Sequence, residues 1–389
     1  MFVYADNAAT TRIDPDVVKA MMPAFDELYG NPSTIYSKGR EAREQVELAR
    51  EKVAKAINCL PREIYFTSCG TESDNWAIRG IAEHYAAKKG KHIISTNIEH
   101  HAVLETLKAM EKEGYRVTLL PVNEEGFVTA RQVEEAICPD TVLITVMTAN
   151  NEIGSIQPIR EIAAVAKEHN VFFHTDAVQA VGHIPVDVQD LGVDLLSLSG
   201  HKFHAPKGIG ALYVRRGILP DNLLYGGGQE RRKRPGTENI PGILAIGAAI
   251  EKATANLERD MAHVSMLRDR LLNGIRQTIP HCKINTPTHD CLPGTVNVSI
   301  KYIEGESMLL MLDMNGICAT SGSACASGDL DPSHVLLAIG LPHEVAHGSV
   351  RFSFCAENTV EEIDYILEVL PKIAARLREM SPLWENVNK

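Results

Sequence analysis

The chain has 389 residues and a formal net charge of −11, with 44% hydrophobic and 23% charged residues. This composition is typical of a globular protein with two domains that share a continuous core, and the negative charge argues against direct binding to nucleic acid or to an anionic membrane. No apolar run approaches the roughly 20 residues needed to cross a bilayer, and the eight cysteines are irregularly spaced, so we expect a cytoplasmic protein without a disulfide scaffold or a membrane segment.

Two kinds of segment alternate from residue 14 to residue 258. Short runs rich in β-branched and apolar residues are followed by longer stretches with helical periodicity. The stretch after the first of these runs, residues 63–68, is expected to form a helix from Gly70 through Ile81. This alternation predicts an α/β domain, with a mostly parallel sheet sandwiched by helices. Sites in such sheets gather beyond the carboxyl ends of the strands. The predicted strands span residues 63–68, 92–97, 115–122, 141–148, 171–178, 193–200 and 208–215.

The pattern changes after residue 258. A long amphipathic helix, residues 257–277, is followed by two short strands and by a final helix over residues 359–380. We interpret residues 259–389, together with residues 1–13, as a smaller α+β domain. The larger domain then comprises residues 14–258.

Lys202 directly follows one of the predicted strands, in the segment LSLSGHKFHAPKGIGALYV. A lysine among small and aromatic neighbours is poorly solvated, loses basicity and can form an imine with a carbonyl group. Asp176 ends another strand with a carboxylate, while Gly70 and Thr71 open a helix whose free N–H groups can bind phosphate. An enzyme that uses pyridoxal phosphate needs such a lysine, a carboxylate for the pyridine nitrogen and a helix start for the phosphate. Together these residues predict that cofactor.

Ten motifs along the chain resemble those of the NifS/IscS-type cysteine desulfurases. They occur in the order found in that family and cover nearly the whole chain. The resemblance implies the fold-type I architecture of pyridoxal phosphate enzymes, a class V aminotransferase-like fold, and a homodimer. It also implies L-cysteine as the substrate. The motifs are DNAATT, YGNPST, GTESDN, EHHAV, ANNEIG, TDAVQAVGH, SGHKFHAPKGIGALY, GTEN, SGSACASG and VRFSF.

The resemblance also implies a role for each matching residue. Lys202 would hold the cofactor covalently, Asp176 would pair with the pyridine nitrogen, and Gln179 would bind the phenolic oxygen of the ring. His100 would stack on the ring and shuttle protons. The substrate carboxylate would be held by Arg351 and by Asn151, which would also contact the cofactor. The phosphate would be bound by Gly70, Thr71, Ser199 and His201, and by Thr237 from the other subunit, so that the site is complete only in a dimer.

Cys325 lies in the segment ATSGSACASGDLDPSHV, which is rich in glycine and serine. The resemblance makes it the sulfur acceptor: it would take sulfur from L-cysteine as a persulfide and leave L-alanine. Such a thiol must reach both a buried ring and an external acceptor, and glycine gives the backbone that freedom. A small core cysteine is the alternative reading, which Cys318 in the apolar NGICAT fits better. The sulfur acceptor would be a protein such as an iron–sulfur cluster scaffold, although tRNA thiolation draws on the same persulfide.

Other functions remain open at this point. The run from His343 to His347, HEVAH, has the H-E-x-x-H pattern of zinc peptidases. Pro342 before it and a strand directly after it leave too little helix for such a site, however, so we expect no metal. An aminotransferase would share the cofactor but needs no nucleophilic thiol. The sequence does not separate a cysteine desulfurase from a selenocysteine lyase or from another fold-type I pyridoxal phosphate enzyme.

Overall fold

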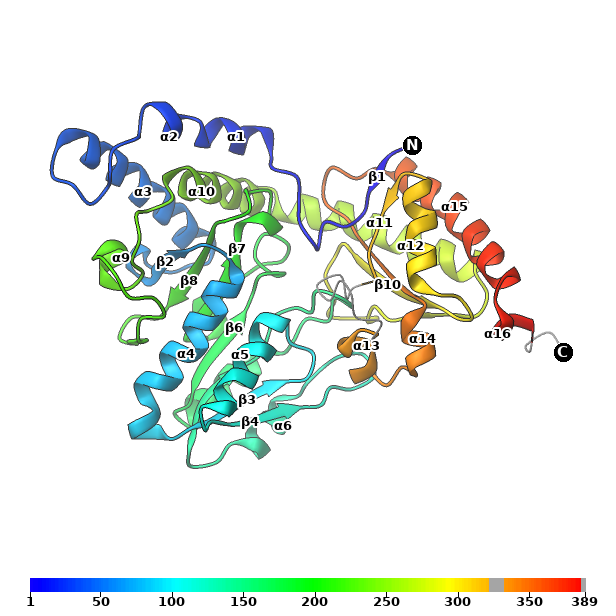
Figure 1. The fold of residues 1–389 in the computed structure, drawn as a ribbon, viewed down its shortest axis with the longest axis horizontal. Helices are drawn as coiled ribbons and strands as arrows, with labels where there is room; N and C mark the ends of the chain where they lie inside the picture. The colour runs from blue at the N-terminus through cyan, green and yellow to red at the C-terminus, as the bar shows by residue number, and fades with distance from the viewer. Residues whose placement is uncertain (322–331, 386–389) are drawn as a thin grey trace.

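A computed structural model describes residues 1–321 and 332–385 of the chain. It contains a seven-stranded sheet flanked by helices and, beside it, a smaller group built on a three-stranded sheet (Figure 1). No helix in the described ranges combines the length and the apolar character that a membrane crossing requires.

The large sheet has the strand order β2-β8-β7-β6-β5-β3-β4. All neighbours are parallel except β8, which runs antiparallel to both β2 and β7. The prediction of a mostly parallel sheet is therefore confirmed. Its strands are β2 (Ile64–Thr67), β3 (His92–Thr96), β4 (Arg116–Leu120), β5 (Thr141–Thr145), β6 (Phe172–Asp176), β7 (Leu195–Ser199) and β8 (Gly210–Val214).

Helices cover both faces of this sheet, so its central strands are apolar on both sides. Successive residues of a strand point to opposite faces. Ile93 and Leu143 accordingly pack in a core with α4 (Gly70–Lys89) and α5 (His101–Lys112). Ile94 and Ile144 pack in a second core on the opposite face. The helices of that face are α1 (Pro15–Met21), α3 (Ser37–Ala56), α6 (Ala130–Ala136), α7 (Ile159–Glu168), α8 (Val188–Leu191) and α10 (Ile240–Ala255).

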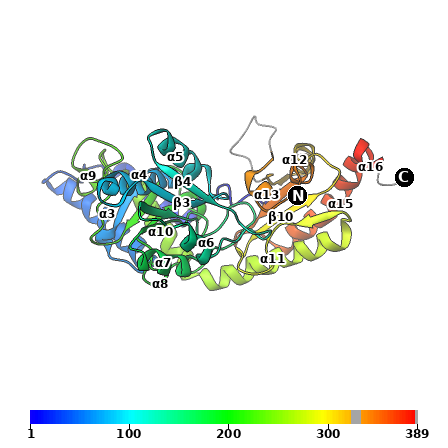
Figure 2. The same ribbon diagram turned by 90° about the horizontal axis from the view of Figure 1, so that it is seen from below.

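The smaller part has a core of its own around an antiparallel sheet of order β12-β10-β9, so the expectation of one continuous core shared by both parts was wrong. The N-terminus belongs to this part, because β1 pairs with β11 before the chain crosses to α1 (Figure 1). Helix α11 begins below the larger part and extends along the smaller one (Figure 2). The elements are β1 (Val3–Tyr4), β9 (Cys282–Ile284), β10 (Thr295–Ile300), β11 (Ile317–Cys318), β12 (Ser349–Ser353), α11 (Leu257–Thr278), α12 (Gly305–Met314) and α15 (Val360–Glu379).

The remaining elements are short and lie in connections. One sequence prediction needs correction here: helix α4 does not end near Ile81 but continues to Lys89, where Gly90 terminates it with a φ of 112°. The HEVAH motif forms only the five-residue helix α14. The short elements are α2 (Pro23–Asp26), η1 (Pro61–Glu63), η2 (Gly200–Lys202), α9 (Gln229–Arg232), α13 (His334–Ala338), α14 (His343–His347) and α16 (Pro382–Glu385).

Candidate active site

Three strand ends bring the predicted residues to one edge of the large sheet. Asp176 is the last residue of β6, Ser199 is the last residue of β7, and Lys202 ends the short η2 helix that follows β7. The N-terminus of α4, with Gly70, comes shortly after β2. Parallel strands with helical crossovers place such residues side by side at the carboxyl edge, as the sequence predicted.

Lys202 is oriented by the N-terminal segment of the chain. Its Nζ donates hydrogen bonds to the carbonyl oxygens of Ala8, at 2.6 Å, and Ala9, at 2.9 Å. Gln179, which is buried, donates from Nε2 to the same carbonyl of Ala8 at 2.9 Å. The loop after β6, the loop after β7 and the first residues of the chain therefore meet at one point.

Asp176 is a buried carboxylate with few partners. One of its oxygens accepts a hydrogen bond from the backbone N–H of Val178 at 2.9 Å. Burial raises its pKa to about 6, against the lowering effects of that hydrogen bond and of the charge of Lys202. A buried carboxylate gains from a cationic partner, and the protonated nitrogen of a pyridine ring is such a partner.

The start of α4 forms an anion cradle with Ser199. A Cβ atom added to Gly70 would lie 2.8 Å from Cγ2 of Val178 and 3.5 Å from Cβ of Ser199, so glycine lets the start of α4 lie close against these two side chains. The buried Oγ of Ser199 has no hydrogen-bond partner within the described residues. Buried hydroxyls are normally satisfied, and a phosphate at this helix N-terminus would accept the missing bond. These residues fit the phosphate of the cofactor.

Two histidines flank the same place, and both are held neutral. His100 caps α5, with its Nδ1 accepting from the N–H of Ala102 at 3.1 Å, which puts the proton of the neutral ring on Nε2. Burial, and then the charge of Lys202, lower the pKa of His100 to about 4. The same causes lower the pKa of His201 to about 4, and its Nδ1 lies 3.1 Å from Oγ1 of Thr10. A neutral imidazole has one N–H hydrogen-bond donor and one acceptor nitrogen.

Arg351 lies in β12 and is 3% exposed. Its Nη2 donates to Oδ1 of Asp6 at 2.8 Å, and its Nη1 donates to the carbonyl oxygen of Asn151 at 2.7 Å. The buried Nε has no hydrogen-bond partner within the described part of the chain. A buried guanidinium with an unused donor favours a carboxylate ligand.

Two predicted phosphate ligands are exposed rather than buried. Thr237 is exposed in the loop between α9 and α10, and no hydrogen bond joins it to the other site residues across residues 1–321 and 332–385. Thr71 is exposed in the first turn of α4. Cys325 lies outside the described residues.

Some groups at the site could not be recognised from the sequence. The carbonyl oxygens of Ala8 and Ala9 carry no side-chain signal, although the motif DNAATT marks their segment. Asp74 on the buried face of α4 is a further case, with Oδ1 3.7 Å from Nε2 of His174. Burial and the nearby charge of Asp176 raise the pKa of Asp74. A carboxylate on the apolar face of a helix is the sequence signal that could have identified it.

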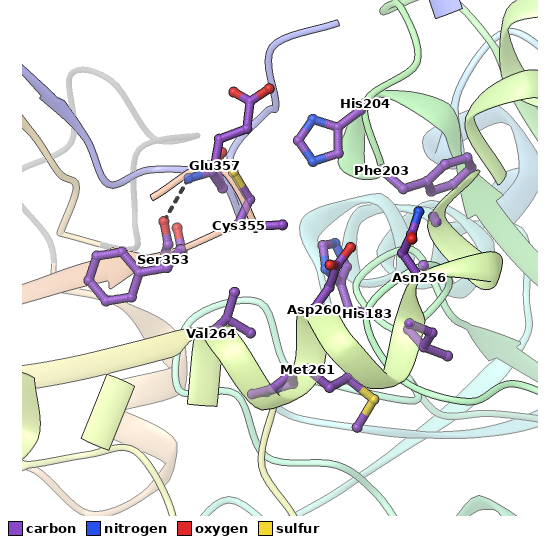
Figure 3. Close-up of a pocket in the computed structure, with 18 of the residues that line it drawn as sticks. His183, Phe203, His204, Asn256, Asp260, Met261, Val264, Ser353, Cys355 and Glu357 are labelled. Atoms are coloured by element: carbon purple, nitrogen blue, oxygen red, sulfur yellow. Dashed lines mark hydrogen bonds between the residues drawn. The ribbon is translucent and has the colours of Figure 1, made fainter. Parts of the chain in front are cut away.

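A separate cavity of about 250 Å³ lies between the two parts of the molecule (Figure 3). Ala8 and Gln179 border it but Lys202, Asp176 and His100 do not, so it is distinct from the edge described above. Figure 3 shows Cys355 in its wall, and burial raises the pKa of that thiol to about 11. Cys355 therefore stays protonated and is poorly suited to accept sulfur.

One group of side chains within the described ranges has the spacing of metal ligands: His92, Cys138 and Asp140. The guanidinium of Arg116 already donates hydrogen bonds to two of these ligand atoms, because its Nη2 lies 2.8 Å from both Sγ of Cys138 and Oδ1 of Asp140. We therefore assign no metal to it. The HEVAH histidines are not part of any such group in the described residues, in agreement with the short α14 helix.

Comparisons with known proteins agree with one another. The model of the family "Aminotransferase class-V" matches residues 3–366. A cysteine desulfurase IscS of Clostridium botulinum is 56% identical over 390 residues, which cover 100% of this chain and 98% of the relative. Among solved structures, a NifS-like protein is 41% identical with a TM-score of 0.91, covering 97% of this chain and 100% of its own. SspA in complex with cysteine is 36% identical with a TM-score of 0.81, covering 92% and 100%.

Proposed function

This chain belongs to the class-V aminotransferase family and is a pyridoxal phosphate-dependent cysteine desulfurase, and we propose that Lys202, Asp176 and Arg351 are the residues that organise its active site. The observation that carries this assignment is the convergence of Lys202 and Asp176 with a phosphate cradle in which the Ser199 hydroxyl has no hydrogen-bond partner among the described residues. This geometry supports the cofactor, and the full-length similarity to cysteine desulfurases favours desulfuration over the other reactions of that cofactor.

Seven residues at the sheet edge would hold the cofactor. When bound, pyridoxal phosphate supplies an electron sink for negative charge that develops on the α-carbon of an amino acid. Lys202 would hold it covalently, Asp176 would keep its pyridine nitrogen protonated and Gln179 would donate to its phenolic oxygen. The phosphate would lie against Gly70, Thr71, Ser199 and His201.

Proton movement falls to Lys202 and His100. The amine of Lys202 would take the proton from the α-carbon of L-cysteine, a general-base role that contributes typically 10²–10⁴-fold to a rate. His100 is neutral with its proton on Nε2, so it would stack on the cofactor and pass a proton to or from the substrate.

Sulfur leaves the substrate by attack of a thiolate. We propose Cys325 for this role: its sulfur forms a bond to the sulfur of L-cysteine, the carbon–sulfur bond of the substrate breaks, and the carbon takes up a proton. L-cysteine and one thiol thus give L-alanine and one persulfide, with atoms and electrons balanced. The assignment of Cys325 to this role rests on the family motif SGSACASG. A selenocysteine lyase, which would act on selenocysteine in place of L-cysteine, is the alternative function.

Arg351 and Asn151 would hold the carboxylate of L-cysteine, and Asn151 would also touch the cofactor. Loss of the guanidinium removes a hydrogen bond to a charged group, worth about 1.5–3 kcal/mol, or roughly 10- to 150-fold in affinity. Arg351→Lys is therefore expected to raise the KM for L-cysteine by about that factor, with a smaller change in kcat. Steady-state assays of alanine formation will measure it.

Arg378→Lys is the matched control, because Arg378 is equally buried in the smaller part but donates to backbone carbonyl oxygens. Its KM should stay within about twofold of that of the parent. An unchanged KM in Arg351→Lys would remove Arg351 from the substrate site.

The enzyme would work as a homodimer with Thr237 reaching the cofactor phosphate of the other subunit. Large apolar side chains are exposed around α2 and in the loop before α9, at the end of the molecule away from the smaller part (Figure 1). A concentration of large exposed apolar side chains at one end of the molecule supports an interface there. The exposed residues are Met22, Phe25, Tyr29, Ile35, Tyr36, Leu224 and Tyr225.

The remaining assignments concern organisation and context. We propose two domains, residues 14–258 and residues 1–13 with 259–389, which agrees with a separate apolar core in the smaller part.

The described cysteines are all free thiols, as in proteins of the reducing cytoplasm. The persulfide would be passed to an acceptor such as an iron–sulfur cluster scaffold protein.

The function is tested by incubating the holoenzyme with L-cysteine and a thiol reductant in the absence of any 2-oxo acid. A desulfurase is expected to release alanine and sulfide in equal amounts over many turnovers. An aminotransferase would stop after one turnover until a 2-oxo acid is added. Multiple turnovers that require the 2-oxo acid would contradict the assignment.

A further inference from the structure

The turn that follows β5 connects the substrate site to a distant part of the chain. The carbonyl oxygen of Asn151 accepts from Nη1 of Arg351 at 2.7 Å. The next residue, Glu152, accepts through its own carbonyl oxygen from Nδ2 of Asn297 in β10 at 3.1 Å. Its carboxylate accepts a hydrogen bond from the hydroxyl of Ser333. Two consecutive residues thus contact three separate segments.

Glu152 is an unusual residue to find at this place. It is 4% exposed, and burial raises the pKa of its carboxyl group, while the hydrogen bond from Ser333 and the charge of Arg351 lower it. A buried carboxylate is costly unless it is paired or hydrogen-bonded. Glu152 therefore depends on Ser333 and on the guanidinium that is proposed to bind the substrate.

The hydroxyl of Ser333 is held by three hydrogen bonds. Its Oγ accepts from the N–H groups of Val335, at 3.1 Å, and Leu336, at 3.3 Å, and so caps α13 while it donates to Glu152. The next residue, His334, places its Nε2 3.0 Å from the carbonyl oxygen of Glu99. Helix α13 then packs in an apolar cluster with residues of the large sheet's loops; its members include Ile98, Met147, Ile153, Val335, Leu336 and Ile339.

Arg351 is also tied to the chain on the other side of Cys325 in the sequence. The backbone of Thr320 pairs with that of Arg351, with the N–H of Arg351 2.6 Å from the oxygen of Thr320 and the reverse bond at 3.3 Å. Thr320 precedes Cys325 by five positions and Ser333 follows it by eight. Thr320 and Ser333, one on each side of Cys325 in the sequence, are therefore both connected to Arg351. Thr320 is bonded to it directly, and Ser333 is connected through Glu152 and Asn151.

We propose that Glu152 is a positioning residue for sulfur transfer: through Ser333 it fixes the start of α13, which follows Cys325 in the sequence, relative to Arg351. A cysteine whose carboxylate lies on Arg351 then presents its sulfur at a defined place relative to the start of that helix. This inference rests on the proposed roles of Arg351 and Cys325, and it deepens them. Misplacement of a reacting group by about 1 Å can cost 10²-fold in rate.

Ser333→Ala, which removes the donor, tests the proposal with two readouts. The first is the change in cofactor absorbance when L-cysteine binds the holoenzyme, which does not need the thiol of Cys325. The second is the rate of persulfide formation in a single turnover. We expect binding within about twofold of the parent and persulfide formation slowed by about 10- to 100-fold. Ser333→Thr, which keeps the hydroxyl, should restore most of the rate.

A double variant guards against a folding defect. Ser333→Ala leaves the carboxylate of Glu152 buried without its donor, whereas Glu152→Ala with Ser333→Ala removes both groups. Because the two residues act as a pair, the double variant should form persulfide about as slowly as Ser333→Ala alone. Thr359→Ala is the matched control, since it also removes a hydroxyl that caps a helix, α15, but one that is bonded to Glu362 instead of Glu152, and it should leave both readouts unchanged.

The outcomes separate this proposal from the proposed function. If Ser333→Ala or the double variant forms persulfide at the parent's rate, the proposed positioning role of Glu152 in sulfur transfer is refuted. An equal loss in both readouts would make the pair a purely structural contact and would also overturn the proposal. A parent enzyme that forms neither alanine nor persulfide would instead refute the desulfurase assignment itself.

Discussion

Lys202→Ala is expected to give a protein without the yellow colour of a lysine-bound cofactor and with alanine formation reduced by at least about 10³-fold. The amine is needed twice, for covalent attachment of the cofactor and for transfer of the α-proton, and general-base catalysis alone accounts for up to about 10⁴-fold. Absorbance spectra and a sensitive alanine assay will measure both effects. The fold should survive, because Lys202 is only partly buried and hydrogen-bonds to backbone carbonyl oxygens.

Lys207→Ala is the matched control for this change. Lys207 lies five residues further along the same loop and is exposed, so its loss should leave both the colour and the activity within about twofold of the parent. A Lys202→Ala protein that retains the lysine-bound absorbance would show that another residue holds the cofactor.

Cys325→Ser should abolish the formation of persulfide and of alanine while the cofactor stays bound. A hydroxyl is far less acidic and less nucleophilic toward sulfur than a thiol, so the carbon–sulfur bond of the substrate should remain intact. Addition of L-cysteine should still change the cofactor absorbance, because Lys202, Asp176 and Arg351 are unaffected.

Cys282→Ser is the appropriate comparison, since Cys282 is a half-buried thiol in β9 that donates to a backbone carbonyl oxygen, a bond that serine preserves. It should behave as the parent does. Sulfide release from Cys325→Ser at the parent's rate would assign the acceptor role to another thiol or to direct elimination.

The sequence predicted the elements of the fold more reliably than their ends. Apolar runs such as residues 141–148 became strands, but β5 stops at Thr145, although Val146 and Thr148 still donate backbone hydrogen bonds to β6. Helix α4 was predicted too short, because polar and charged residues after Ile81 interrupt the apolar pattern. The helix nevertheless continues to Lys89 and is capped by Gly90. Strand β8 runs antiparallel to β7, which directly precedes it in the chain, and to β2, which is distant in sequence. The connection from β7 to β8 is too short for the helical crossover that a parallel pair requires, whereas no local pattern encodes the pairing with β2.

The site was predictable where side chains carry the chemistry. Lys202, Asp176 and the start of α4 stand at strand ends, so a general rule of α/β sheets brings them together. The carbonyl oxygen of Ala8, which receives both Lys202 and Gln179, has no side-chain signature and appears only in three dimensions. The pairing of Glu152 with Ser333 was equally hidden, because 181 positions separate them.

The central claim is that cofactor chemistry at Lys202 loosens a carbon–sulfur bond and that the thiol of Cys325 takes the sulfur. Its most direct test is a single turnover with one equivalent of L-cysteine, followed by mass spectrometry of the peptide that contains Cys325 and by quantitation of alanine. We predict that this peptide gains the mass of one sulfur atom in step with the formation of one alanine. Alanine without added sulfur on that peptide, or added sulfur confined to another cysteine, would contradict the claim.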